Sequence, residues 1–305
     1  MMSCVMELRH LRYYVAVAEA LSFSKAAPRL RVAQPALSRQ IQDLEDEIGV
    51  DLFTRSTRGV TLTAEGKLFL DEARELLRRA DEAVEKTRAL ARGEFGELQI
   101  GYSPSPTVEF LPAALGEFQK AVPRVLVRLY DLAGNELADG IRNGTLELAV
   151  MQRPMGPNGA GLTFESLHSY SICVAVPPKH PFASLRAVSI AKLAAEKLVV
   201  FRRREYTDYH ALLDRVFQGV RQRPPIAVEC DGVSSLTTEI AAGRGVAIVS
   251  RVFSNTFGTR LKLRPLTPAP AAQEVGIVRS LKGDVTPAGE KFCAQLRSAA
   301  SRLAK

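Results

Sequence analysis

The spacing of apolar residues at the start of the chain predicts three short helices. The apolar face of the first, spaced by three and four residues and ending near Leu21, consists of Leu8, Leu11, Val15 and Ala18. Either Ser22 or Ser24 can cap the second helix, and Pro35 fits the first turn of a third that starts at Gln34. The buried stripe of the third helix consists of Leu37, Ile41, Leu44 and Ile48. With a wing after it, this pattern predicts a winged helix-turn-helix.

Polar side chains at the start of the third helix lie off its apolar stripe, where they can meet the edges of DNA bases. Gln pairs bidentately with adenine and Arg with guanine, and each good pair contributes roughly 1–3 kcal/mol of discrimination. The candidate DNA contacts of this segment are Ser24, Lys25, Gln34, Pro35, Ala36, Ser38 and Arg39. No acid lies among them, whereas four acids follow that we expect to face water: Asp43, Glu45, Asp46 and Glu47. The alternative is an ordinary three-helix bundle with solvated charges.

The spacing of apolar residues over 63–92 predicts one long helix with a heptad seam. Apolar and small residues recur along it at alternating spacings of four and three: Phe69, Ala73, Leu76, Ala80, Ala83, Thr87 and Leu90. Such a seam needs a partner, so we expect the helix to dimerise; the alternative is packing against its own chain. A dimer would hold two copies of the third helix roughly 34–36 Å apart, the repeat of a two-fold DNA site. The Gly-containing segment 93–96 ends the helix.

From residue 97 onward, apolar strands alternate with amphipathic helices. The expected strands are 98–101, 125–129, 146–151, 162–167, 172–176, 198–201, 226–229 and 246–249. The expected helices are 108–122, 135–143, 190–195, 209–218 and 235–242. This alternation predicts an α/β fold with doubly wound parallel sheets.

Polar residues cluster where three of these strands end. Ligands of open α/β sheets bind at the carboxyl ends of strands, near helix N-termini whose free N–H groups favour anions. The candidate ligand contacts are Ser103, Ser105, Thr107, Gly134, Asn135, Phe201, Arg202 and Ser234. Arg202 can pair bidentately with a carboxylate while Phe201 covers an apolar body. The alternatives are simple helix capping by the hydroxyls and a solvated run of arginines at 202–204.

Composition and charge are those of a globular protein. The 305 residues suffice for two or three domains, and 46% are hydrophobic and 24% charged. The net charge of +8 is uneven, because residues 1–92 carry 15 basic and 14 acidic side chains and the remainder carries 26 and 19. The positive excess therefore lies outside the helix-turn-helix and favours an anionic small-molecule ligand.

No signature of export or catalysis stands out. The sequence shows neither a signal peptide nor an apolar run long enough for a membrane, so we expect no membrane partner. The four cysteines are Cys4, Cys173, Cys230 and Cys293. Their lack of metal or redox spacing favours reduced, inert thiols in a bacterial cytoplasm, and the alternative is a thiol sensor. Ser22-x-x-Lys25 has the spacing of a catalytic Ser-Lys pair but lies inside the helix-turn-helix. Gly243-x-Gly245 lacks the lysine of a phosphate-binding loop, and the four histidines are isolated from any nucleophile or ligand spacing. We expect no enzymatic activity, no metal and no cofactor.

Six motifs resemble the N-terminal signature of LysR-type transcriptional regulators. They are ELRHLRYY (7–14), SFSKAA (22–27), QPALSRQI (34–41), LE (44–45), LFTR (52–55) and LTAEG (62–66). The resemblance implies that the residues matching Gln34, Pro35, Ser38 and Arg39 enter the major groove. The wing residue Arg58 would reach into the minor groove, whose negative potential draws arginine, and Arg55 is a further candidate DNA contact. Pro28 departs from the family pattern, and we expect a small distortion there, at the edge of the second helix's first turn.

The same resemblance covers the whole chain and implies a two-lobed effector domain similar to periplasmic binding proteins. The expected parts are a winged helix-turn-helix (6–63), a dimerising linker helix (64–93) and an effector-binding domain (97–305). Lobe I would be 97–166 and 271–305, including a returning strand at 275–278 and a closing helix at 287–302, and lobe II 167–270. We expect a regulator that binds promoter DNA, responds to a carboxylate or other anionic inducer, and forms a homodimer or homotetramer. The alternative is a solute-sensing module whose helix-turn-helix contacts a protein.

Overall fold

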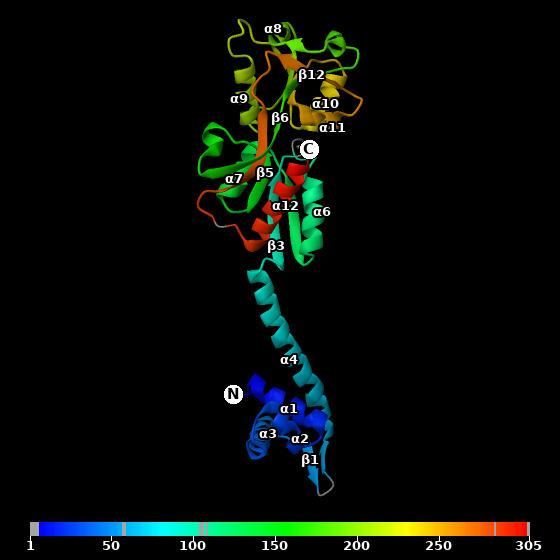
Figure 1. Cartoon of the computed structure of the whole chain (residues 1–305), viewed down its shortest axis with the longest axis vertical. Helices are drawn as coiled ribbons and strands as arrows, with labels where there is room; N and C mark the ends of the chain where they lie inside the picture. Colours follow the sequence, from blue (N-terminus) through cyan, green and yellow to red (C-terminus); the bar gives the residue numbers. More distant parts are fainter. Residues whose placement is uncertain (1–5, 57–58, 104–106, 108, 284, 304–305) are drawn as a thin grey trace. The chain divides into compact units, whose positions relative to one another are not determined.

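The computed structural model describes residues 6–56, 59–103, 107, 109–283 and 285–303. The chain divides into two compact units, Met1–Arg88 and Ala89–Lys305 (Figure 1), and each has its own hydrophobic core. Within the residues described, no helix is both long enough and apolar enough to span a lipid bilayer.

The first unit has the predicted winged helix-turn-helix. Its elements, with the helix that leads out of it, are α1 (Leu8–Ala20), α2 (Phe23–Leu30), α3 (Gln34–Ile48), β1 (Phe53–Ser56), β2 (Gly59–Leu62) and α4 (Ala64–Ala91). Ser22 accepts a hydrogen bond from the Lys25 N–H and caps α2, as its position predicts. Pro28 lies in the second turn of α2, later than expected, and Arg31 ends that helix with a φ of 57°.

Aromatic packing and one close backbone contact join the helices to the wing. The ring of Tyr14 lies 5.3 Å from that of Phe53 in β1 and 5.0 Å from that of Phe69 in α4, centre to centre. The buried Tyr14 hydroxyl also donates to the Gly66 carbonyl oxygen. A Cβ at residue 66 would lie 2.0 Å from the Leu52 carbonyl oxygen, so only glycine lets α4 begin this close to the wing. The LTAEG motif is thus explained by packing.

The buried side of α3 differs from the prediction at its C-terminal end. The first three residues of the expected stripe are buried, but Ile48 is 36% exposed. Glu45, which we expected to face water, is only 7% exposed. Its Oε1 accepts hydrogen bonds from the backbone N–H groups of Leu52 (2.8 Å) and Phe53 (3.0 Å). The carboxylate is buried because it satisfies two N–H groups at the start of the wing that would otherwise be unpaired.

A five-stranded sheet dominates one half of the second unit. Its order is β4-β3-β5-β13-β6. The strands are β3 (Gly96–Tyr102), β4 (Val125–Asp131), β5 (Leu148–Gln152), β6 (Leu162–Tyr170) and β13 (Gln273–Ser280). β3 runs parallel to β4 and β5, whereas β13 is antiparallel to β5 and β6. Our prediction of a purely parallel sheet is therefore wrong. The chain returns from the other half through β13, which runs opposite to β5 and β6.

Helices cover both faces of this sheet (Figure 1). α6 (Leu111–Ala121) and α12 (Pro287–Leu303) pack together on one face, and α7 (Gly134–Arg142) packs on the other. Alternate residues of β5 point to the two sides: Leu148 and Val150 join the large core, and Ala149 and Met151 join the core beneath α7. The rings of Phe118 and Phe292 meet edge to face at 5.3 Å on the α6–α12 side.

The other half of the second unit contains two smaller sheets. One has the order β11-β7-β12-β8, and the other pairs β9 and β10 in parallel. The strands are β7 (Ile172–Val176), β8 (Val188–Ser189), β9 (Leu198–Phe201), β10 (Ile226–Cys230), β11 (Ala247–Ser250) and β12 (Lys262–Thr267). The helices are α8 (Ile190–Leu193), α9 (Thr207–Val216), α10 (Val233–Ala241) and α11 (Ser254–Phe257), with single turns η1 (Gly156–Gly159), η2 (Pro181–Ser184) and η3 (Arg251–Phe253). The predicted α/β class is confirmed, with mixed rather than parallel sheets.

Candidate functional site

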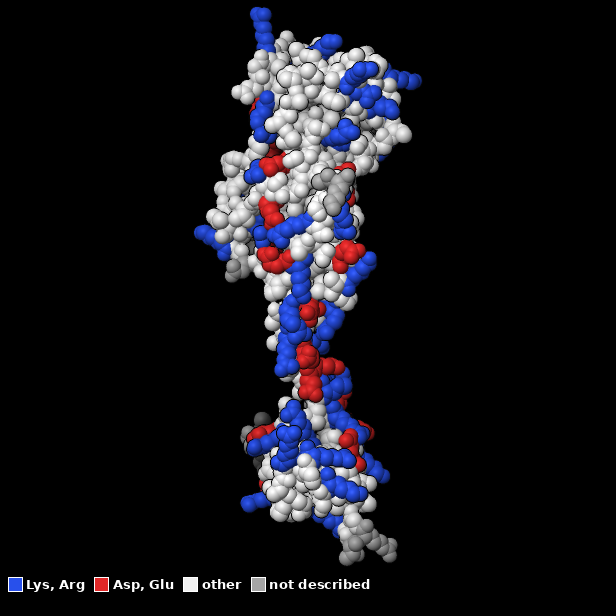
Figure 2. Space-filling view, in the orientation of Figure 1, with Lys and Arg blue, Asp and Glu red and all other residues white. Residues whose placement is uncertain are grey.

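The N-terminal end of α3 presents an exposed polar surface in the first unit. One shallow depression is lined by Gln34, Pro35, Ser38, Arg39, Gln42, Asp43 and Asp46. Ala36 on the same helix is exposed, as are Ser24 and Lys25 at the start of α2. Gln42 was not singled out from the sequence, although its spacing of four from Ser38 places both on one helix face. Lys and Arg predominate over Asp and Glu on the visible face of this unit (Figure 2).

Arg55, predicted to contact DNA, ties the wing to α3. Its guanidinium donates to the Glu45 carboxylate at 3.0 Å and to the Ser38 hydroxyl at 3.4 Å. It also lies 5.1 Å from the centre of the Phe23 ring. The Arg55 side chain is still 38% exposed, so it can meet a phosphate while it anchors the wing. The second wing arginine, Arg58, lies outside the described residues.

The long helix α4 has two different stretches along its predicted seam. Near its start, Ala73 is buried and Phe69 packs against the core of the first unit, which is the alternative that we considered for the whole helix. Farther along, Leu76 is 43% exposed, and Val84, which widens the apolar stripe beside the seam, is 48% exposed. Charged residues elsewhere on α4 form ion pairs within the helix, as between Glu75 and both Arg78 and Arg79. These partners lower the pKa of Glu75 to about 2.

A cavity of about 60 Å³ lies in the second unit, between the five-stranded sheet and the half that contains β9 and α9. Four of the predicted ligand contacts line it: Ser103, Gly134, Asn135 and Phe201. Further polar or aromatic lining residues that we did not predict are Gln152, Tyr206, Asp208, Tyr209, Ser250 and Gln273. Gln152 ends β5 and Ser250 ends β11, so the rule that ligands meet strand ends would have found both.

The remaining predicted ligand contacts lie elsewhere. Ser234 lines a second, wider cavity of about 560 Å³, which shares Leu132, Tyr206 and Val233 with the first. Thr107 is buried and its hydroxyl donates to the Ser103 carbonyl oxygen at 2.8 Å, which is a structural contact. Arg202 is exposed and lines neither of these two cavities. Ser105 lies outside the described residues.

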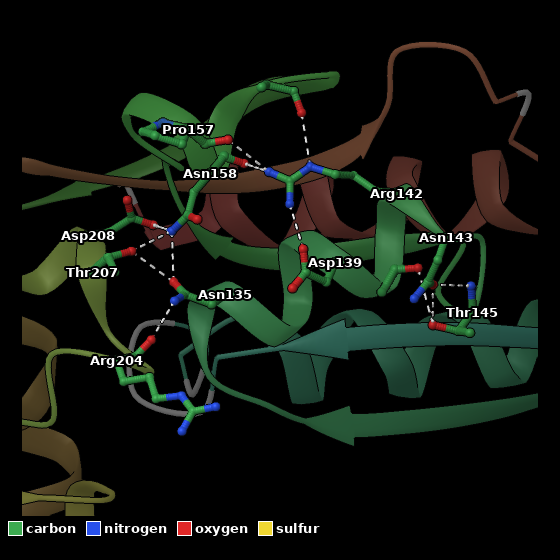
Figure 3. Close-up of polar contacts among 12 residues, drawn as sticks. Asn135, Asp139, Arg142, Asn143, Thr145, Pro157, Asn158, Arg204, Thr207 and Asp208 are labelled. Carbon is green, nitrogen blue, oxygen red and sulfur yellow. Dashed lines mark hydrogen bonds and ion pairs between the residues drawn. The ribbon is translucent and has the colours of Figure 1, made fainter.

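A hydrogen-bond network closes one side of the smaller cavity (Figure 3). Asn158, in η1, lies between Asn135 of α7 and the first turn of α9. Its Nδ2 is 2.8 Å from Asn135 Oδ1, 2.7 Å from Thr207 Oγ1 and 3.2 Å from Asp208 Oδ2. The Met155 N–H donates to the other oxygen of Asp208 at 3.0 Å. The network thus joins the two halves of the second unit through the loop that contains η1.

Arg142 holds that loop in place from α7. Its guanidinium donates to the carbonyl oxygens of Pro157 and Asn158, at 3.1 and 2.6 Å, and to Asp139 at 2.7 Å (Figure 3). A separate bridge between the two halves uses Glu109, which accepts from Tyr170 Oη at 2.8 Å and from Asn255 Nδ2 at 2.6 Å.

Burial governs the titratable groups around the cavity. Burial raises the pKa of Asp208, and the hydrogen bonds from Asn158 and Met155 oppose that shift. Burial likewise raises the pKa of Tyr206 and Tyr209, so both hydroxyls stay protonated and able to donate at neutral pH. Over the part of the chain that the structure describes, no cluster of three or more His, Cys, Asp or Glu side chains is placed to hold a metal ion.

The described cysteines are buried and unpaired: Cys173, Cys230 and Cys293. Burial raises the pKa of all three thiols, that of Cys293 to about 11. At neutral pH these thiols are protonated, and the protonated form is a poor nucleophile.

Family models match both units of the chain. Residues 8–67 match the model for the bacterial regulatory helix-turn-helix protein, lysR family, and residues 91–301 match the LysR substrate binding domain. The chain is 32% identical over 261 residues to the HTH-type transcriptional regulator AlsR of Bacillus subtilis, covering 86% of each protein. It is 31% identical over 290 residues to the Hca operon transcriptional activator HcaR of Escherichia coli, covering 95% of this chain and 96% of that protein.

Solved structures agree with these matches. Full-length CbnR complexed with its target DNA superposes with a TM-score of 0.80 at 27% identity, covering 97% of this chain and 100% of that chain. Full-length BenM gives a TM-score of 0.59 at 26% identity and covers 98% of each chain.

The winged helix-turn-helix and the α/β unit with its cavity define a DNA-binding regulator with an effector-binding domain. The chain belongs to the LysR family of transcriptional regulators. This family acts by binding DNA and not as enzymes, which confirms the expectation from the sequence. The alternative of a sensing module whose helix-turn-helix contacts only proteins is therefore set aside.

Proposed function

We propose that this regulator reads a two-fold promoter site with α3 from two copies, and that a small molecule in the cavity of the second unit controls it. The observation that carries the first part is the exposed polar surface at the start of α3. CbnR, complexed with its target DNA, supports this mode of binding. The proposed DNA contacts are Ser24, Lys25, Gln34, Pro35, Ala36, Ser38, Arg39, Arg55 and Arg58. Such a protein works in the bacterial cytoplasm, where promoter DNA lies.

Substitution of the two base-reading side chains tests the DNA contacts. Gln34→Ala and Arg39→Ala each remove one bidentate pair, worth about 1–3 kcal/mol, so affinity for the specific site should fall about 5- to 150-fold. Fluorescence anisotropy with the promoter DNA upstream of the protein's own gene, at fixed salt, measures this loss. Arg186→Ala removes an exposed positive charge from the second unit and serves as the control. Unchanged affinity in both α3 variants would contradict the assignment.

The exposed stretch of α4 supports dimerisation. Apolar side chains such as Leu76 and Val84 are left about half exposed along the predicted seam, and in water they favour a partner surface. We propose that the linker helix, residues 64–93, forms the dimer contact. In sequence it follows a DNA-binding domain (6–63) and precedes a two-lobed effector domain (97–305). Lobe I would be 97–166 and 271–305, and lobe II 167–270. Homotetramers would then form through the effector domains.

A charge placed in the seam tests this assembly. Val84→Lys should lower the fraction of dimer at micromolar concentration by at least tenfold, because the seam would bury two ammonium groups. Sedimentation velocity measures the distribution of species. Asp71→Lys is the matched control, because Asp71 is exposed on another face of α4. If the Val84→Lys variant assembles as the parent does, α4 is not the dimer contact.

The cavity supports control by a small molecule. It lies between two halves that are joined by the Asn158 network and the Glu109 bridge, so a ligand can change how these halves close. The proposed contacts are Ser103, Ser105, Gly134, Asn135 and Phe201. A ligand shifts DNA binding only if it binds the two states unequally. A ligand that occupies the cavity without changing the affinity for upstream DNA would contradict this control.

A further inference from the structure

The smaller cavity of the second unit offers no cationic side chain to a ligand. None of the described residues that line it is Lys or Arg. Asp208 is the single carboxyl group among the described lining residues. A carboxylate in this cavity would therefore have no ionic partner and would face a group of its own sign.

Helix N-termini are the second source of positive potential, and side chains of this chain bond to one N–H at the start of α7 and one at the start of α10. At α7, Glu136 Oε2 accepts from the Ala133 N–H at 3.0 Å. At α9 no side chain caps the helix, but Asp208 carries its carboxylate in the first turn. At α10, Ser235 Oγ accepts from the Gly232 N–H and donates to Asp231. A carboxylate in the first turn of a helix compensates the positive end of its dipole, so Glu136 and Asp208 weaken the attraction of α7 and α9 for an anionic ligand.

The second cavity adds negative charge beside the first. It contributes four carboxylates and one guanidinium: Asp131, Glu136, Glu205, Asp231 and Arg260. The two cavities share Leu132, Tyr206 and Val233, so a ligand in the smaller one lies beside this acidic lining. Charges this close in a partly desolvated site interact strongly, because the surrounding medium screens them less than bulk water does.

Two buried side chains that line the smaller cavity have hydroxyl groups without a hydrogen-bond partner among the described residues. The side chains of Tyr209 and Ser250 are 7% and 2% exposed, and both line the cavity. Neither Tyr209 Oη nor Ser250 Oγ has a hydrogen-bond partner among the residues that the structure describes. Buried hydroxyls are nearly always paired, so a molecule that enters the cavity can offer these two the acceptor that the described side chains do not supply. The rest of the wall is apolar or amide, with Phe201, Phe253 and Met151 among the apolar side chains.

We infer that the effector of this regulator is a small uncharged molecule with an apolar body and a hydrogen-bond acceptor, held by the hydroxyls of Tyr209 and Ser250. This inference rests on the proposed function, because it names the class of molecule that the proposed effector cavity selects. It replaces the anionic inducer expected from net charge and from Arg202, which lies outside both cavities. The cavity volume of about 60 Å³ fits a small molecule.

Thermal shift of the full-length chain with matched probes tests the inference. Two sets share a carbon skeleton and differ in charge: isobutyramide, isobutyrate and isobutylamine, and benzamide, benzoate and benzylamine. We expect at least one amide to raise the melting temperature, and to do so at a tenfold lower concentration than its carboxylate and its amine. Tyr209→Phe and Ser250→Ala should each weaken the response to that amide at least fivefold. Tyr130→Phe and Ser184→Ala, which lie outside the cavity lining, should respond as the parent does.

The other outcomes overturn the inference. A carboxylate or an amine that stabilises the chain at lower concentration than its amide would show a charged ligand class. The absence of a response to both amides, or equal responses of the parent and the Tyr209→Phe and Ser250→Ala variants, would also overturn it. Anisotropy with upstream DNA separates this failure from that of the proposed function. A charged probe that alters DNA affinity would leave an effector-controlled regulator with another ligand class, whereas no preference for upstream DNA would remove the function itself.

Discussion

The carboxylate of Glu45 is expected to hold the wing against α3, and its removal should destabilise the first unit by about 3 kcal/mol. Glu45 Oε1 accepts from the buried N–H groups of Leu52 and Phe53, and Oε2 accepts from Arg55 at 3.0 Å. An unpaired buried N–H costs about 1–3 kcal/mol, so Glu45→Ala leaves two such costs. We take a value near the lower end of their sum, because water can enter the space that the side chain leaves. The pair with Arg55, whose side chain is 38% exposed, adds at most about 1 kcal/mol.

Urea denaturation of the full chain, followed by far-UV circular dichroism, measures this change. The two units have separate cores, so we expect the first unit to unfold in a transition of its own. With a urea slope of about 1–2 kcal/mol/M, a loss of about 3 kcal/mol moves its midpoint down by about 1.5–3 M. Glu45→Gln keeps an acceptor oxygen and should cost only about 1 kcal/mol.

Asp46→Ala is the matched control, because Asp46 is the next residue of α3 and is exposed. Its substitution should stay within about 0.5 kcal/mol of the parent. If Glu45→Ala proves no more destabilising than Asp46→Ala, the buried carboxylate does not anchor the wing, and the argument from its two backbone hydrogen bonds is wrong.

Two further predictions concern the second unit. Hydrogen bonds from Arg297 lower the pKa of Glu165 in the folded state below its unfolded value of about 4.3. The stability that Glu165 contributes is therefore present above about pH 4.3. It is lost as the pH falls through the folded-state pKa of Glu165. The difference in melting temperature between the parent and Glu165→Gln should therefore be constant near pH 7 and shrink below about pH 4.3, and a difference that grows on acidification would contradict the sign. Asn158→Ala removes the contacts to Asn135, Thr207 and Asp208. Amide hydrogen exchange in η1 and the first turn of α9 should therefore speed up about tenfold, while exchange in α12 stays the same. If η1 exchanges at the same rate in the variant and the parent, the network does not hold the loop.

The sequence pattern predicted most of the first unit because local rules determine it. The Ser22 cap and the start of α3 at Gln34 follow from residues close to one another in the chain. The burial of Glu45 was not predicted, because its partners, Leu52 and Phe53, lie at the start of the wing and not on α3. A carboxylate on a helix normally faces water, and only the tertiary contact shows that this one is buried.

In the second unit the pattern predicted the strands but not how they pair. β13 joins the sheet antiparallel to β5, from more than a hundred residues away, and alternation along the chain carries no information about that direction. β12 was missed because its sequence includes charged Lys262 and Arg264 and the proline Pro265.

The cavity could be placed from strand ends, but its electrostatics could not. Ser103, Asn135 and Phe201 line it as expected. The hydrogen bonds of Glu136 and Ser235 to N–H groups at the starts of α7 and α10 are seen only in the folded structure. The uncharged ligand inferred from the cavity therefore differs from the anionic one that net charge favours.

A footprint on the upstream DNA tests the central claim most directly, namely that two copies of α3 read one two-fold site. The full chain should protect two half-sites whose centres lie about 10–10.5 base pairs apart or a multiple of that spacing, and Gln34→Ala should weaken both protections together, by the same factor as it lowers the affinity. Protection of a single half-site by a monomer, or equal protection of random DNA, would contradict the account.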